Sequence, residues 1–214
     1  SYHTFWPSPN DDPMHQSNIP EQLEMIDFYD IVAVPRAFVN GGLIKGGSFE
    51  GAPNGLTAEL IDQKNRQKGL FQLDLTQSFS GSQLMVNLSV SPYILPSNIQ
   101  PHLKLALVED QIDFSSPPGD NGERIFKLVF RIFFYGSLGE NIGTLQVGST
   151  LNRQYMETLD SDWNTDRLRV IAWVQDTSSK QVWATQRTGT LTSVDTNEGK
   201  IPLDFQVRQG RLWL

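Results

Sequence analysis

The chain has 214 residues, of which 38% are hydrophobic, 10% aromatic and 19% charged, which is the balance of a globular protein with one large or two small domains. Its formal charge of −7 disfavours general binding to nucleic acid, because an acidic surface repels phosphate groups, and the densest basic stretch (Lys64, Arg66 and Lys68) fits the solvated side of a short helix. The complete lack of cysteine excludes disulfides, thiolate nucleophiles, iron–sulfur clusters and cysteine-ligated zinc in this chain.

The ends and the apolar runs of the chain bear on its processing and its relation to a membrane. No apolar run approaches the roughly 20 residues that a membrane-spanning helix needs, so we expect no membrane span. The chain starts at Ser1 rather than Met and carries no signal peptide, which favours a processed product or an excised segment.

Residues 1–69 mix short apolar runs with helical patterns. Asn18 is a good N-cap, since Pro20 and Glu21 follow it at first-turn spacing and apolar residues continue at helical intervals. Asn40 and Gly41 end an extended run and predict a tight hairpin turn. The expected elements are a strand over Tyr2–Trp6, a helix after Asn18, a strand within Ile31–Val39, its partner over Leu43–Phe49, and a helix over Leu56–Arg66 capped by Asn54.

This order of elements resembles the C-terminal two-thirds of a thioredoxin-like fold. The stretch from Val34 to Gly41 is similar to the family's cis-proline loop and the hairpin after it. Tyr2-His3-Thr4, Asp12-Pro13-Met14 and Phe28-Tyr29 more specifically resemble secreted thioredoxin-like proteins of the Omp28-related outer membrane type from Bacteroidetes. The resemblance covers about the first 65 residues and implies an extracytoplasmic location, secreted or associated with the outer membrane.

The resemblance also marks what this segment lacks. In the family, a strand and a helix carrying Cys-x-x-Cys come first, and neither is present before Tyr2. Pro35 is the candidate cis-proline; with no cysteine nearby, we favour a structural role for it over a role beside a substrate groove. The missing elements would leave an uncovered sheet edge near Tyr2–Trp6, which predicts either a homodimer or another element covering it.

Residues 70–190 alternate apolar and polar side chains in six or seven segments separated by turn residues, which predicts an immunoglobulin-like antiparallel β-sandwich. The segment Arg124–Tyr135 is apolar on both faces, so we expect it to be a central strand. Residues 191–214 form either a hairpin of Phe205–Val207 with Arg211–Leu214 or the start of a further domain. The predicted class is therefore α+β, a partial thioredoxin-like unit followed by a sandwich.

Several polar groups are candidates for chemistry. His3 fits a core or rim histidine, His15 a solvated acidic loop beside Asp11 and Asp12, and His102 a strand edge. Glu109 and Asp110 are neighbours on a strand and should point to opposite faces. One oxygen-rich stretch resembles the start of a calcium-binding loop, but Thr165 and Ile171 stand where that motif needs Gly and Glu, which favours a polar loop leading into a strand. The stretch comprises Asp160, Asp162, Asn164 and Asp166.

No catalytic constellation, cofactor motif or metal motif emerges from these residues. The sequence therefore favours a non-catalytic binding or accessory module of a secreted or cell-envelope protein, with a protein or a small molecule as ligand. Two alternatives stay open. The chain could be a fragment of a thiol–disulfide oxidoreductase whose Cys-x-x-Cys lies upstream, or a structural or adhesin-like segment.

Overall fold

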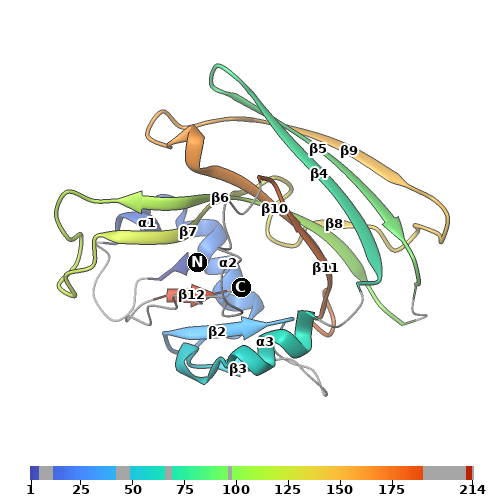
Figure 1. Ribbon diagram of the computed structural model, residues 1–214, viewed down its shortest axis with the longest axis horizontal. Helices are drawn as coiled ribbons and strands as arrows, with labels where there is room; N and C mark the ends of the chain where they lie inside the picture. Colours follow the sequence, from blue (N-terminus) through green and yellow to red (C-terminus); the bar gives the residue numbers. More distant parts are fainter. Residues whose placement is uncertain (5–11, 42–48, 66–68, 96–97, 190–210, 214) are drawn as a thin grey trace, which may run out of the picture.

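The computed structural model describes residues 1–4, 12–41, 49–65, 69–95, 98–189 and 211–213. It is mostly antiparallel β-sheet with a few short helices (Figure 1). In chain order the elements are β1 (Tyr2–His3), α1 (Pro13–Gln16), α2 (Ile19–Phe28), β2 (Arg36–Val39), β3 (Phe49–Gly51), η1 (Pro53–Gly55), α3 (Ala58–Asn65), β4 (Phe71–Ser80), β5 (Gln83–Pro92), β6 (Pro101–Asp113), β7 (Ile125–Phe133), β8 (Glu140–Asn141), β9 (Leu151–Thr158), η2 (Thr165–Arg167), β10 (Leu168–Asp176), β11 (Val182–Arg187) and β12 (Arg211–Trp213).

Two sheets from residues 70–190 pack face to face. The larger has the strand order β11-β10-β6-β7, with β8 pairing with β6, and the smaller has the order β4-β5-β9. Every strand pair in both sheets is antiparallel. Figure 1 shows the smaller sheet lying as a separate layer over the larger one.

The core between these sheets follows from strand alternation. Every second residue of β5, β6 and β10 points into it, because successive side chains of a strand point to opposite faces. Its fully buried members are Leu84, Val86, Leu88 and Val90 from β5, Leu103, Leu105 and Leu107 from β6, and Leu168, Val170, Ala172 and Val174 from β10.

A four-stranded sheet with the order β1-β12-β2-β3 forms beside the sandwich. β12, near the C-terminal end of the sequence, lies between β1 and β2, antiparallel to β1 and parallel to β2. Tyr2 is only 1% exposed and pairs with Leu212. Of the two outcomes expected for the edge near Tyr2–Trp6, the structure thus has another element covering it; Phe5 and Trp6 lie outside the described residues.

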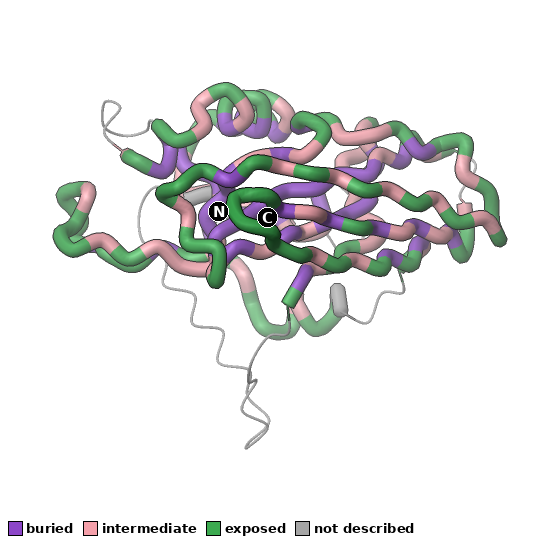
Figure 2. Tube along the Cα trace, turned by 90° about the horizontal axis from the view of Figure 1, so that it is seen from above, coloured by how far each residue is buried: buried purple, intermediate pink, exposed green. Residues whose placement is uncertain are grey.

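A second core joins this unit to the sandwich. Tyr2 from β1 and Met25 from α2 pack with Phe130 from β7 and Trp173 from β10. These side chains lie on the face of the five-stranded sheet that is turned away from β4, β5 and β9. Figure 2 shows the buried residues as a continuous band through the middle of the molecule. The two predicted domains, residues 1–69 and 70–190, therefore share one interior, and the domain boundary at residue 69 stays a prediction.

The position of the strand within Arg124–Tyr135 was predicted wrongly. This strand, β7, lies at the end of its sheet, and β6 and β10 are the inner strands. Both faces of β7 are nevertheless apolar because one packs on the sandwich core through Ile132, while the other packs on α1, α2 and β1 through Phe126 and Phe130. Burial on two faces is therefore no proof of a central position.

The predicted tight hairpin after β2 is also wrong. Asn40 and Gly41 have the expected positive φ values of 59° and 86°, but Val39 lies opposite Phe49, a register that no tight turn at these two residues can give. Residues 42–48, most of the predicted partner strand, lie outside the described residues. A Cβ at Gly41 would lie 1.7 Å from the carbonyl oxygen of Lys180, so this glycine permits close packing against the β10–β11 turn.

The two predicted helix caps differ in outcome. The Asn18 side chain accepts a hydrogen bond from the amide of Glu21, as expected at the start of α2. At α3 the predicted cap, Asn54, lies in the short helix η1, and Thr57 accepts from the amide of Leu60 instead. In the hairpin predicted at the C-terminus, Phe205–Val207 lies outside the described residues, so that pairing stays a prediction.

Candidate functional site

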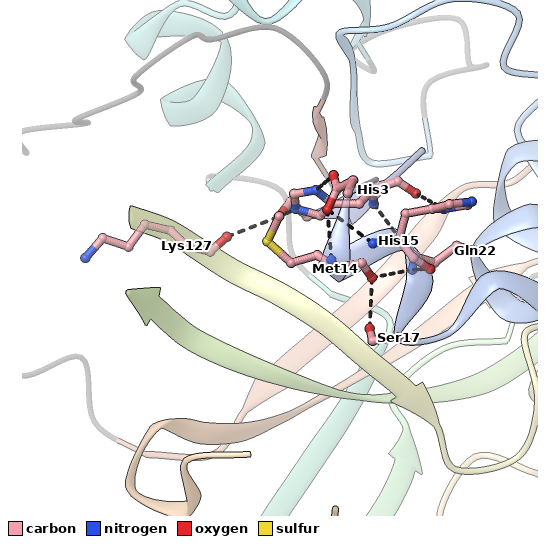
Figure 3. Close-up of polar contacts among 8 residues, drawn as sticks. His3, Met14, His15, Ser17, Gln22 and Lys127 are labelled. Atoms are coloured by element: carbon pink, nitrogen blue, oxygen red, sulfur yellow. Dashed lines mark hydrogen bonds and ion pairs between the residues drawn. The ribbon is translucent and has the colours of Figure 1, made fainter. Parts of the chain in front are cut away.

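His3 is the centre of a buried polar cluster that links β1 to α1 and α2 (Figure 3). Its ring Nδ1 lies 2.7 Å from Oδ2 of Asp12, and its backbone amide donates to Oε1 of Gln22 at 2.6 Å. Gln22 donates in turn to the carbonyl oxygens of Met14 and His15 at 2.8 and 3.1 Å. Each polar group of this cluster thus ties one element to another.

Asp12 does two things in the cluster. Its Oδ1 accepts from the amides of Met14 and His15, which caps α1, while its Oδ2 pairs with His3. Burial alone would raise its pKa, but the hydrogen bonds from His3 and from the two amides hold the pKa of Asp12 below its ordinary value. The carboxylate is therefore charged at neutral pH.

The Ser1, His3 and Asp12 side chains follow the order of an acyl-transfer triad, and their geometry decides against that role. Oγ of Ser1 lies 3.4 Å from Nε2 of His3, while its hydroxyl donates to the carbonyl of Lys127 at 3.1 Å. The His3 side chain is only 2% exposed. The contacts fit a structural tie between β1 and β7 better than an activated nucleophile.

The two histidines of this cluster test the sequence predictions in opposite ways. The prediction of a satisfied core histidine is confirmed for His3. The prediction of a solvated loop is wrong for His15, which is 2% exposed in α1 with its Nδ1 3.1 Å from the carbonyl oxygen of His3. His15 lies in the four-residue helix α1, which Asp12 caps and Pro13 begins. This helix directs the side chain toward the interior.

Pro35 lies in the segment that leads into β2. The Val34–Pro35 peptide bond is cis, and Val34 packs against the core shared by the two units. Directly after it, Arg36 forms an ion pair of 2.7 Å with Glu50 across the β2–β3 pair. The structural role assigned to Pro35 stays a prediction.

The candidate calcium loop uses its oxygens for turns. Oδ1 of Asp160 accepts from the amide of Asp162 at 3.0 Å, and Oδ1 of Asn164 accepts from the amide of Asp166 at 3.1 Å. All four side chains are exposed. Among the described residues no group of three or more His, Cys, Asp or Glu side chains is placed to hold a metal ion.

The carboxylates of Glu109 and Asp110 point to opposite faces of β6, as predicted. Glu109 pairs with Arg131 at 2.6 Å in the buried region, while Asp110 lies between Arg187 at 2.5 Å and Arg169 at 3.3 Å. Each carboxylate therefore serves a separate ion pair. His102 is half-buried at the start of β6, with Nδ1 3.0 Å from the carbonyl oxygen of Gln100.

Lys104 is a buried group that sequence reasoning missed. It is 0% exposed on β6, and its Nζ has no hydrogen-bond partner in the described part of the chain. The amine lies 3.9 Å from the ring centroid of Phe28 in α2. Burial lowers the pKa of Lys104 to about 7. The alternation of Leu103, Lys104 and Leu105 placed this lysine on the polar face of a strand, and only the packing of α2 on that face buries it.

The outer face of the β4–β5–β9 sheet is the second feature missed. It consists of the outward-pointing residues of the three strands, which are exposed or half-buried. It carries amide and hydroxyl groups, two methionines and one charged member, Asp74. We call this set the outer face. Its members are Gln72, Asp74, Thr76, Ser78 and Ser80 of β4, Gln83, Met85, Asn87, Ser89 and Ser91 of β5, and Asn152, Gln154, Met156 and Thr158 of β9.

Hydrogen bonds fix several side chains of the outer face. Gln154 donates to Asn87 at 2.8 Å and Gln83 donates to Thr158 at 2.7 Å, both across the β5–β9 pair. At one end, the hydroxyl of Tyr93 donates to Oε1 of Gln72 at 2.9 Å, which holds a ring that is 58% exposed. The sequence signal was available as polar residues at every second position of three segments, but such a pattern is ordinary for any solvated strand face.

Comparison with known proteins gives a fold but no family. No protein-family model matches the chain, and no curated protein matches it. The structure of HBP35 of Porphyromonas gingivalis is similar with a TM-score of 0.62 and 9% identity, covering 90% of this chain and 65% of that one, so this chain spans less than two-thirds of HBP35. A domain of the outer membrane lipoprotein Omp28 from the same organism gives a TM-score of 0.41 and 12% identity, covering 56% of this chain and 86% of that domain. The likeness to HBP35 shows a shared overall fold.

No helix in the described ranges combines the length and the apolar character that crossing a membrane requires.

Proposed function

We propose that this chain is a non-catalytic binding or accessory module of a secreted or cell-envelope protein, and that the outer face is its binding surface. The composition of the outer face carries the proposal. The Omp28-related sequence resemblance supports the extracytoplasmic location, and the sheet orders support a thioredoxin-like unit joined to an immunoglobulin-like sandwich.

The near-absence of charge on the outer face points to a neutral ligand. Exposed protein surfaces commonly carry about 25–35% charged residues. Asp74 is the one charged member of the outer face, in a chain whose formal charge is −7. Amide and hydroxyl groups donate and accept hydrogen bonds equally well, which suits a hydroxyl-rich ligand such as a neutral polysaccharide. The exposed ring of Tyr93 offers a flat apolar surface for a sugar ring.

The sheet behind the outer face is a rigid support. β4 pairs with β5 from Phe71 to Ser80, and β5 pairs with β9 from Val90 to Gln83, both in continuous register. The opposite side of these strands is locked into the sandwich core. Side chains that are already ordered lose less conformational entropy on binding, so a weak polar contact contributes more net affinity.

The experiment is affinity electrophoresis of the purified chain through gels that contain a neutral glucan, a neutral mannan or an acidic polysaccharide. We expect retardation by a neutral polymer, and at least a tenfold loss of affinity in the double variant Asn87→Ala and Gln154→Ala. The control is Gln63→Ala, an exposed amide on α3.

Two results would contradict the proposal. If no neutral polymer changes the mobility of the chain, neutral polysaccharides are not its ligands. If Gln63→Ala weakens the affinity for the polymer as much as the double variant does, the outer face is not the binding surface.

A further inference from the structure

β9 is an uncovered edge of its sheet. It pairs with β5 from Leu151 to Thr158 without a register shift, and in the described part of the chain no strand pairs with its other side. Its eight residues therefore present a regular row of backbone groups to solvent. Such a row is a template for pairing with another strand.

The other edge of the same sheet, β4, is linked to the larger sheet by a side chain. Gln77 of β4 donates to the carbonyl of Leu168 at 2.9 Å and accepts from the amide of Val170 at 3.1 Å, which joins the middle of β4 to β10. The end of the larger sheet is covered as well, because the amide of Phe130 in β7 donates to the carbonyl of Ser1. β9 has no backbone cover among the described residues, and its side-chain link to the larger sheet is the ion pair of Arg153 with Glu140 of β8.

Of the usual guards of an exposed edge, β9 has only a pair of inward-pointing charges. It contains no lysine, no proline and no bulge. Its charged residues are Arg153, Glu157 and no others, and they have opposite signs. They lie on the inward row of the strand, two positions either side of Tyr155.

This spacing makes β9 complementary to itself. When two β9 strands lie antiparallel with the two Tyr155 residues opposite each other, Arg153 of each copy lies opposite Glu157 of the other. Directly opposite charges of unlike sign stabilise a strand pair. A shift of the register by one two-residue step either way places Tyr155 opposite Arg153 or opposite Glu157, and both charge pairs are lost.

To form such a pair, Arg153 has to share its guanidinium between Glu140 and Glu157 of the partner copy, or exchange one for the other. Arg153 uses Nε and Nη2 for Glu140, while its Nη1 bonds to the carbonyl of Asn152 at 3.0 Å. Glu157 forms no ion pair with any residue in the described ranges. Burial raises the pKa of Glu21 on α2, and the negative charges of Glu24 and Glu157 add to this effect. A half-buried carboxylate near other carboxylates gains from an incoming guanidinium.

We propose that two copies of this chain associate edge to edge through β9, in the antiparallel register that pairs Arg153 with Glu157 of the partner copy. The contact is two-fold symmetric and joins two three-stranded sheets into one of six strands. The two outer faces then form one continuous surface. The association stands independently of what the outer face binds.

The test is sedimentation velocity of the purified chain at about 10 to 500 μM, because an interface of one strand pair is smaller than that of a stable dimer. We expect a concentration-dependent dimer for the natural sequence. Arg153→Glu places like charges opposite each other in a homodimer, and so does Glu157→Arg, so each variant alone should associate at least tenfold more weakly. An equimolar mixture restores both charge pairs and should form dimers again.

Circular dichroism and a melting curve establish that each variant is folded, since Arg153→Glu also loses its ion pair with Glu140. Glu59→Arg, a charge reversal at an exposed position of α3, is the control and should dimerise normally. A monomeric natural sequence at 500 μM overturns the proposal, and so do folded variants that dimerise normally alone. Failure of two folded variants to associate when mixed overturns it too.

Discussion

At the scale of single residues, Lys104 shows two effects in competition. The ring of Phe28, 3.9 Å from Nζ, favours the ammonium form by roughly 1–2 kcal/mol. Complete burial opposes it and lowers the pKa to about 7, because the amine has lost its water and no acceptor in the described residues replaces it. Burial is the larger effect, so this lysine destabilises the fold at neutral pH.

Replacing Lys104 by methionine should therefore stabilise the protein by about 3–4 kcal/mol at pH 7. The unfolded chain binds the proton more tightly than the folded one, so the stability of the natural protein should rise with pH between about 7 and 10.5. Lys104→Met should lack this rise, so the difference in stability between the two proteins should narrow steadily from pH 7 to about pH 10.5. Urea unfolding across this pH range measures it.

The control for this change is Lys127→Met, since Lys127 is exposed on β7. It should alter stability little and leave the slope with pH unchanged. A Lys104→Met protein that is less stable than the natural one at pH 7 would show that the amine is solvated.

At the scale of elements, Asn18 illustrates how a local signal and a tertiary contact act through one side chain. Its Oδ1 caps α2, which the sequence predicted from Glu21 three residues later. Its Nδ2 also donates to the carbonyl of Arg131 on β7 at 2.8 Å, which no local pattern could indicate. Similarly, Asn40 and Gly41 adopt turn conformations, yet Val39 lies opposite Phe49, ten positions along the chain, which is too far for a tight hairpin. Register depends on the partner strand as well as on the turn residues.

Substituting Asn18 separates these two contributions. Asn18→Ser keeps a capping oxygen but loses the bond to β7, whereas Asn18→Ala loses both. We expect Asn18→Ala to reduce the free energy of unfolding by about 1–2 kcal/mol, and Asn18→Ser by about half as much. Chemical denaturation measures both, with Asn152→Ala on the outer face as a control that should cost little. Equal losses for Ser and Ala would mean that the cap contributes nothing.

At the scale of the whole molecule, residues 1–69 and residues 70–190 share an interior built around Phe130 and Trp173. We expect one cooperative unfolding transition rather than two, since neither side of this core can be exposed alone without loss of the other. Phe130→Ala should lower the stability by about 3–5 kcal/mol and keep a single transition. Calorimetry of the natural protein and the variant tests this; two resolved transitions would establish independent domains.

The sequence by itself determined those features that depend on neighbours along the chain. It located the alternating strands of the sandwich, the helix after Asn18, the opposed faces of Glu109 and Asp110 and a core or rim position for His3, because strand period and capping chemistry act within a few residues. It also excluded thiol chemistry in this chain through the lack of cysteine.

Only the tertiary structure decided the features that depend on which distant segments meet. The packing of α2 buries Lys104, the placement of β1 and α2 over β7 makes an edge strand apolar on both faces, and β12 lies between β1 and β2. The outer face and the open edge of β9 likewise exist because β5 pairs with both β4 and β9. Long-range pairing is fixed by the whole set of complementary surfaces, which no local window of the sequence contains.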